Sequence, residues 1–267
     1  MLNMKRKFLI STFIVGFAAF SACSSELSSY ENKIKKEAES FNQDLSSIEI
    51  KKRALRLTKW SSLDYFEKDI QKFLDQDKAS PPPRDAILFI GSSSIVFWKT
   101  LETDMHPFRV INRGFGGSHI AHVNNYLEEI VLPYNPRGIV FYCGGNDIFG
   151  LKTPEEVLQD FLHFYKTIKA NLPEVKVFVI GIKPSAAREY QKVKHIQWND
   201  SVEKLSDKDE NLFFIDVRPT MLLENGKPNP DLFVEDGLHM NSKGYAIWTK
   251  LLKPYLESNF KPDKTNL

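Results

Sequence analysis

The sequence Ala86-Ile-Leu-Phe-Ile-Gly-Ser-Ser-Ser-Ile-Val-Phe-Trp98 joins an apolar run, a glycine, a row of serines and a second apolar run. The first run is short and lies between Pro81-Pro-Pro83 and Gly91, which predicts a buried parallel strand rather than a helix. A serine between such a strand and a helix lies at the carboxyl end of a sheet. Open α/β folds bind ligands there, and helix N–H groups can stabilise an oxyanion. The competing interpretation is that one of these serines only caps the helix.

The chain after this stretch alternates between strand and helix patterns. Further apolar runs predict strands at 108–112, 138–142, 175–180 and 212–216. Helical patterns are expected at about 119–131, 153–170, 188–206 and 242–256. Strands and helices that alternate through short loops predict an α/β fold, with a five-stranded parallel sheet covered by helices on both faces. No fixed period repeats, and no second domain is evident.

The N-terminus has the features of an export signal. Lys5-Arg-Lys7 is basic, and the mostly apolar run Phe8–Phe20 is too short to span a bilayer comfortably. Phe20-Ser-Ala-Cys23 resembles the lipobox of bacterial lipoproteins, in which the chain is cut just before a cysteine that then carries lipid. We therefore expect a lipoprotein-type signal peptide over 1–22 and lipid attachment at Cys23. The alternative is an ordinary secretory signal that happens to contain a cysteine, and both interpretations imply export.

The segment after the signal is rich in mixed charge and shows no clean apolar period. We interpret 23–58 as a tether, in part helical, between the membrane and the domain. From Trp60 an apolar stripe at three- and four-residue steps predicts an amphipathic helix that packs on the domain. The expected domain covers 59–260 and includes this helix, and 261–267 form a tail.

The overall composition narrows the classes of function. The chain has 267 residues, 42% hydrophobic and 26% charged, with a formal net charge of +2, which gives no support for a nucleic-acid partner. Its two cysteines, Cys23 and Cys143, cannot form a disulfide framework, and Cys143 reads as a small buried residue. No zinc-binding spacing is present, and we expect neither a metal nor a cofactor.

Four short polar blocks follow or flank the predicted strand ends: Gly91-Ser-Ser-Ser94, Gly114-Phe-Gly-Gly117, Gly144-Gly-Asn-Asp147 and Asp236-Gly-Leu-His239. Because the carboxyl ends of parallel strands lie on one edge of a sheet, these loops can converge. Together they contain a hydroxyl nucleophile, a histidine base, a carboxylate and hydrogen-bond donors. These are the components of an acyl-transfer site.

These four blocks, in this order, resemble those of the SGNH hydrolases, also called GDSL-type esterases and lipases. That family is defined by blocks carrying Ser, Gly, Asn and His in sequence. The similarity extends from about Trp60 to Tyr255. It implies the family's flavodoxin-like, three-layer α/β/α sandwich.

The resemblance also assigns roles to residues. It implies that Ser93 is the nucleophile, that His239 is the general base and that Asp236 orients the histidine. Ser92 stands where the family usually has aspartate and Ser94 where it has leucine or isoleucine, so the choice among the adjacent serines rests on the alignment.

Three groups match the family's oxyanion hole. They are the backbone N–H groups of Ser93 and Gly117 and the side-chain amide of Asn146. Gly117 could alternatively be a plain turn glycine, and Asn146 could simply form an Asx turn.

The implied function is hydrolysis of carboxylic esters through an acyl-enzyme. We expect short acyl or acetyl groups, as in an acetylesterase, although a lysophospholipase-like activity also fits the family. The substrate would be an acylated glycan or lipid outside the cytoplasm, at the periplasmic side or the cell surface. Two alternatives stay open: a catalytically silent domain that binds glycan or scaffolds the envelope, and an acyltransferase acting on envelope polymers.

Overall fold

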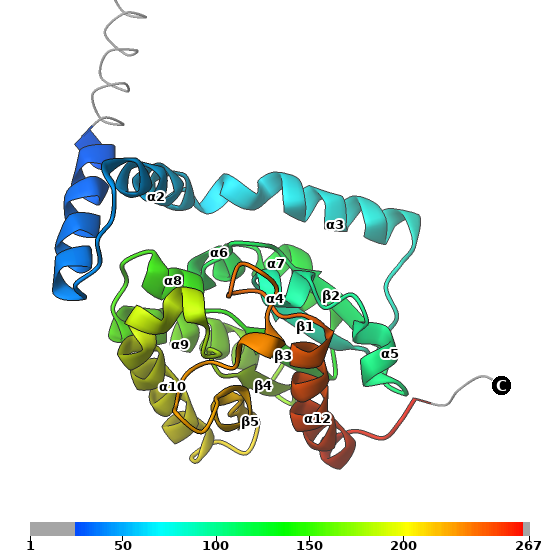
Figure 1. Cartoon of the computed structure of the whole chain (residues 1–267). Coiled ribbons are helices and arrows are strands. Elements are labelled where there is room, and N and C mark those ends of the chain that lie inside the picture. The colour runs from blue at the N-terminus through cyan, green and yellow to red at the C-terminus, as the bar shows by residue number, and fades with distance from the viewer. Residues whose placement is uncertain (1–24, 264–267) are drawn as a thin grey trace, which may run out of the picture. The chain divides into compact units, whose positions relative to one another are not determined.

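The computed structural model describes residues 25–263 (Figure 1). The expected signal peptide over 1–22 and Cys23 lie outside the described residues, so the predicted lipid attachment stays a prediction. The chain divides into two compact units, with the boundary between Tyr65 and Phe66. Across 25–263, no helix combines the length and the apolar character needed to cross a membrane.

Within residues 25–65, the N-terminal unit forms one α-helix over 25–40 and a second, α2 (Ser47–Trp60). A capping box between Ser46 and Glu49 starts α2, which satisfies the free N–H groups of its first turn. A buried ion pair joins Arg53 to Glu37 at 2.5 Å. The apolar side chains buried in this unit lie at helical spacing: Ile34, Ala38, Ile50, Ala54 and Leu57. The region expected to be a partly helical tether is therefore mostly helical. Its narrow apolar face is hard to recognise in the sequence, because charged residues lie between the apolar ones.

The C-terminal unit is built on a five-stranded sheet with strand order β2-β1-β3-β4-β5, in which all neighbours are parallel. The strands are β1 (Ile87–Gly91), β2 (Val110–Gly114), β3 (Gly138–Tyr142), β4 (Lys176–Ile180) and β5 (Leu212–Ile215). The predicted α/β fold with a five-stranded parallel sheet is confirmed. All strands point the same way, but the order in which the chain adds them reverses between β1 and β3, which makes that position the switch point of the sheet.

Strand β2 differs most from its prediction, because it begins and ends two residues later than 108–112. Its pairing with β1 runs in register from Ile87↔Val110 to Gly91↔Gly114. The polar residues Asn112 and Arg113 resemble a strand end in sequence, but the ladder with β1 extends across them.

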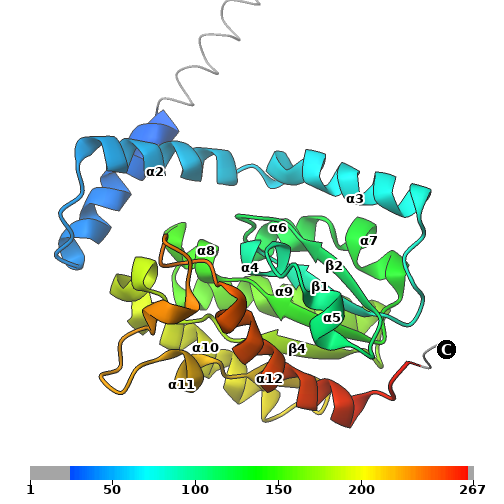
Figure 2. The ribbon, with the colours of Figure 1, turned by 45° about the vertical axis from the view of Figure 1, so that its right-hand side comes forward.

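Helices cover both faces of the sheet, and α5 and α12 lie in front of it in Figure 2. Adjacent residues of β3 show the two layers: the ring of Tyr142 lies 4.8 Å from Trp248 of α12, and Phe141 lies 4.6 Å from Phe164 of α9. Helices α6, α9 and α10 pack side by side on the α9 face. The longer helices are α9 (Pro154–Asn171), α10 (Lys192–Ser206) and α12 (Ser242–Asn259), and the shorter ones are α4 (Ser93–Val96), α5 (Leu101–Met105), α6 (Ile120–Asn125), α7 (Leu127–Ile130), α8 (Gly145–Phe149) and α11 (Arg218–Met221).

The helix predicted from Trp60 is divided. Helix α2 ends at Trp60, the 3₁₀ turn η1 (Leu63–Phe66) follows, and α3 (Glu67–Ala79) begins within the C-terminal unit. Asp77 of α3 accepts hydrogen bonds from Arg113 of β2 and, at 2.6 Å, from the hydroxyl of Tyr134. Helix α3 is thus fixed to the sheet. The remaining 3₁₀ turns are η2 (Leu132–Tyr134), η3 (Ala186–Gln191) and η4 (Pro230–Leu232).

Candidate active site

The turn after β1 presents a serine at the edge of the sheet. Gly91 has φ +139°, and a Cβ at this position would lie 1.9 Å from the carbonyl oxygen of Tyr142. Only glycine fits there. The N–H of Ser92 donates to the same carbonyl at 3.0 Å, and Ser93 is the first residue of α4. The serine therefore lies at the carboxyl ends of β1 and β3, where the strand order reverses.

Ser93, His239 and Asp236 form one hydrogen-bonded line. The Oγ of Ser93 lies 2.9 Å from Nε2 of His239, and Nδ1 of His239 lies 2.5 Å from Oδ2 of Asp236. A proton on Nδ1 satisfies the carboxylate and leaves Nε2 free to accept the Ser93 hydroxyl proton. Among the adjacent serines, Ser93 is the one whose hydroxyl contacts the histidine, whereas Ser94 Oγ accepts a hydrogen bond from Lys183 at 3.1 Å.

The loop that carries the acid and base is held by its own backbone. Oδ1 of Asp236 accepts from the N–H of Leu238 at 2.8 Å and from that of His239 at 2.9 Å. Partial burial raises the pKa of Asp236, but the hydrogen bonds from these N–H groups and from the imidazole outweigh it, so the pKa lies below its ordinary value. Asp236 is therefore ionised at neutral pH. The half-exposed ring of Phe97 packs edge-on against the His239 ring, with the ring centres 4.9 Å apart.

The second and third blocks converge on the same serine. Gly117 has φ +89°, a conformation that favours glycine, and a Cβ at Gly116 would lie 3.8 Å from Cβ of Ser93. Asn146, in α8, lines one pocket with Ser93, and its Nδ2 donates to the carbonyl of Ser118 at 3.2 Å. Because an amide nitrogen carries two hydrogens, one donor of Asn146 is left for a ligand.

Two contacts that the sequence did not predict hold the short helix α4. The side chain of Asn112 donates to the carbonyl of Ile95 at 2.7 Å and accepts from the N–H of Gly114 at 2.9 Å. From the other side, the hydroxyl of Tyr245 donates to the carbonyl of Ser94 at 2.9 Å. The nucleophile is thus positioned by β2 and α12 as well as by its own turn.

Asp147, the last residue of the third block, connects that block to the first turn of α6. Its carboxylate is fully buried, accepts from the N–H of Ile120 at 3.1 Å and lies 3.6 Å from Nζ of Lys152. Burial raises the pKa of Asp147 to about 6, against the opposing influence of Lys152. Since Asn146 precedes Asp147 directly, the buried contact fixes the position of the amide.

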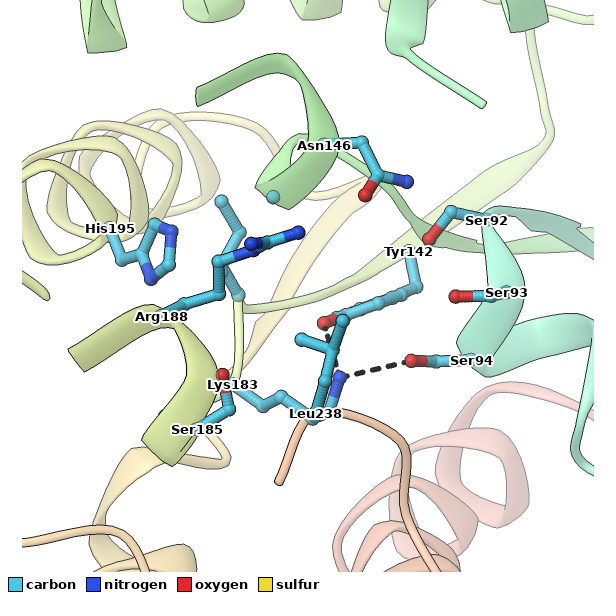
Figure 3. A pocket seen from close by; sticks show the side chains of 12 residues that line it. Ser92, Ser93, Ser94, Tyr142, Asn146, Lys183, Ser185, Arg188, His195 and Leu238 are labelled. Atoms are coloured by element: carbon cyan, nitrogen blue, oxygen red, sulfur yellow. Dashed lines mark hydrogen bonds between the residues drawn. The ribbon is translucent and has the colours of Figure 1, made fainter. Parts of the chain in front are cut away.

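A pocket beside Ser93 contains further polar residues that the sequence did not single out. Figure 3 shows Lys183, Ser185, Arg188 and His195 around the same hollow as Ser93. Lys183-Pro-Ser185 follows β4 and so lies at the same sheet edge as the other blocks. A lysine and a serine directly after a predicted strand were therefore the signal by which the sequence could have indicated these residues.

All five site residues expected in the domain meet at this edge: Ser93, Gly117, Asn146, Asp236 and His239. Their catalytic roles stay predictions. Cys23 is outside the described residues.

Comparison with known proteins shows the family. The model of the GDSL-like lipase/acylhydrolase family matches residues 94–247, more than half of the chain, so the protein belongs to that family. The match begins one residue after Ser93 and includes the three later blocks. A comparison with curated proteins found no match.

Solved structures share the fold. A GDSL-like lipase from Bacteroides thetaiotaomicron is 20% identical, with a TM-score of 0.62 over 72% of this chain and 98% of that one. A lipase/acylhydrolase from Enterococcus faecalis is 19% identical, with a TM-score of 0.52 over 68% of this chain and 100% of the other. A carbohydrate esterase family 3 structure from Talaromyces cellulolyticus is 17% identical, with a TM-score of 0.52 over 66% and 96%. Membership of the GDSL-like lipase/acylhydrolase family supports ester hydrolysis as the general activity, and these structures show that the fold is shared.

Proposed function

We propose that this protein hydrolyses carboxylic esters through an acyl-enzyme formed on Ser93. The observation that carries the proposal is the hydrogen-bonded line from Ser93 through His239 to Asp236. A nucleophile, a base and an orienting carboxylate within hydrogen-bond reach form the arrangement that activates a serine hydroxyl.

The reaction has two halves. Oγ of Ser93 attacks the ester carbonyl while Nε2 of His239 takes the hydroxyl proton. His239 then gives this proton to the departing alcohol as the C–O bond breaks. In the second half a water molecule, deprotonated by His239, attacks the acyl-serine, and the proton returns to Ser93 as the acid leaves. The ionised Asp236 stabilises the imidazolium that forms in each half.

The negative charge that develops on the carbonyl oxygen is stabilised by preorganised hydrogen-bond donors. The N–H groups of Ser93 and Gly117 and the free hydrogen of Asn146 are the proposed set. The removal of one such donor typically lowers turnover by roughly 100- to 1,000-fold.

The size of the pocket favours small acyl groups. The cavity beside Ser93 has a volume of about 30 Å³. A cavity needs roughly 10–15 Å³ to hold one water molecule, so the enclosed space beside Ser93 fits a group of a few non-hydrogen atoms, such as an acetyl methyl or a carboxylate. We therefore propose acetyl or other short acyl esters. The carbohydrate esterase among the structural neighbours agrees with an acylated glycan as substrate.

Turnover of p-nitrophenyl esters from acetate to long chains tests the proposal. Purified wild type should hydrolyse the acetate fastest, and Ser93→Ala should lose roughly 10⁴-fold or more in kcat. Ser92→Ala is the matched control, because Ser92 is adjacent but does not contact His239 in the described hydrogen bonds. Turnover that survives in Ser93→Ala would refute Ser93 as nucleophile. A wild type inactive on every ester would favour a glycan-binding domain.

We also propose that the protein is exported and lipid-anchored through Cys23, on the strength of the N-terminal sequence. In a bacterial host, the wild type should partition with membranes and incorporate labelled fatty acid. Cys23→Ser should do neither. Equal labelling of both would contradict the proposal.

A further inference from the structure

The pocket beside the proposed nucleophile contains a buried cation. Lys183 is 4% exposed, and its Nζ donates to Ser94 Oγ and to the Tyr142 hydroxyl, both at 3.1 Å. An ammonium group has three donors, so one N–H of Lys183 has no hydrogen-bond acceptor among residues 25–263, although Nζ also lies 5.2 Å from the centre of the Tyr142 ring. No carboxylate of the described chain forms an ion pair with it. A buried charge without a counter-ion is costly in free energy.

The rest of the lining adds to the positive charge. Of the twelve residues that line the pocket, all in the described part of the chain, none is acidic. Arg188 lines it from η3, with its guanidinium 3.6 Å from the centre of the Phe149 ring. Figure 3 shows Arg188 and Lys183 on the same side of the hollow, across from Ser93.

His195 supplies an independent observation. Its ring is 6% exposed and lines the pocket, and its Nε2 has no hydrogen-bond partner among residues 25–263. Burial, followed by the charges of Arg188 and Lys183, lowers the pKa of His195 to about 3. The imidazole is therefore neutral at pH 7, and a ligand can still hydrogen-bond to it.

A purely structural role explains these features poorly. A neutral amide could connect Ser94 and Tyr142 without the cost of burying a charge. A bound anion would give the ammonium its counter-ion and use its free donor.

We propose that Lys183 and Arg188, with Ser185 and His195, form a subsite for a negatively charged group of the substrate, such as a carboxylate. This inference rests on the proposed ester hydrolysis and specifies its substrate class: esters with an anionic group close to the scissile bond, on the acid or on the alcohol side.

Matched pairs of esters that differ only in charge test the subsite. Monomethyl succinate against methyl succinamate places the charge on the acid side, and 4-acetoxybenzoate against 4-acetoxybenzamide places it on the alcohol side. The readout is the ratio of kcat/KM within each pair, measured for the purified full chain by acid release. We expect the wild type to prefer the anion in one pair by roughly tenfold or more, the scale of a desolvated charge contact.

Substitutions at Lys183 test whether this side chain causes the preference for the anionic ester. Lys183→Gln should reduce the ratio to about one, and Lys183→Arg, which keeps the charge, should retain a part of the preference. Lys192→Gln is the matched control, because its side chain is 59% exposed, pairs with Glu189 and does not line the pocket. If Lys183→Gln does not fold, Arg188→Gln takes its place.

Each outcome is decisive. No preference in either pair, with neutral esters still hydrolysed, overturns the subsite and leaves ester hydrolysis standing. A preference that persists in Lys183→Gln, or disappears equally in Lys192→Gln, also overturns it. A wild type that hydrolyses no ester removes the proposed function and, with it, this inference.

Discussion

The substitution Asp236→Asn tests the proposed mechanism, because the two side chains have almost the same shape. Asparagine can keep the two backbone hydrogen bonds that Oδ1 accepts from Leu238 and His239. Its other group is an NH₂ donor, however, at the position 2.5 Å from Nδ1 of His239. Nδ1 must then accept, so the ring proton moves to Nε2 and points at Ser93. Nε2 can no longer take the serine proton.

The expected loss follows from this change of tautomer. The same substitution in a serine protease triad lowers kcat by roughly 10⁴-fold, and we expect about 10³- to 10⁴-fold here at pH 7. The assay is p-nitrophenyl acetate turnover, with thermal unfolding to verify the fold. Asp231→Asn is the matched control, because this nearby acid lies on η4 and makes no described contact with His239. A loss below about tenfold in Asp236→Asn would refute the orienting role of the carboxylate.

The remaining predictions concern the turn, the oxyanion hole and a buried acid. Gly91→Ala should destabilise the fold by roughly 3 kcal/mol or more, since its Cβ would lie 1.9 Å from the Tyr142 carbonyl oxygen. The control Gly226→Ala, with φ +73° and open space around its Cβ, should cost only about 1 kcal/mol. Equal melting temperatures of the two variants would contradict this prediction. Asn146→Ala should lower kcat by roughly 100- to 1,000-fold with little change in KM, and an unchanged kcat would remove Asn146 from the oxyanion hole. The pKa of Asp147 is raised to about 6 from 3.8, so the folded state binds this proton more tightly than the unfolded state. Stability from this group should rise as the pH falls from about 6 to 4, by up to roughly 3 kcal/mol, and urea unfolding should show no such increment in Asp147→Asn.

The parts of the fold visible in the sequence are those set by local pattern. The apolar run before Gly91 and the run 138–142 are buried along their whole length, so their composition alone identifies central strands. Helix α9 was predicted at Thr153 because the capping residue, Pro154 and Glu156 mark its start, and the capping box is present. The limits of β2 were wrong by two residues, because pairing with β1 and not hydropathy sets them.

The parts that the sequence concealed depend on distant contacts. Lys183 follows a strand and resembles a solvated lysine, and its burial emerges only when Ser94 and Tyr142 enclose it. Asn112 likewise gains its function from a carbonyl that belongs to Ile95, on another element. The site blocks could be predicted because parallel strands bring their carboxyl ends to one edge. The residues that surround these blocks, such as Lys183 and Asn112, could not be predicted, since their contacts depend on how the other elements pack around the site.

We propose that the hydroxyl of Ser93 becomes covalently acylated during turnover. Incubation with a fluorophosphonate, followed by peptide mass spectrometry, tests it most directly, because this reagent phosphonylates a serine only when a neighbouring base activates it. We expect one adduct on Ser93, absent from Ser93→Ala and from His239→Ala, with Ser92 and Ser94 unmodified. An adduct on Ser92 or Ser94, or labelling that persists without His239, would contradict it.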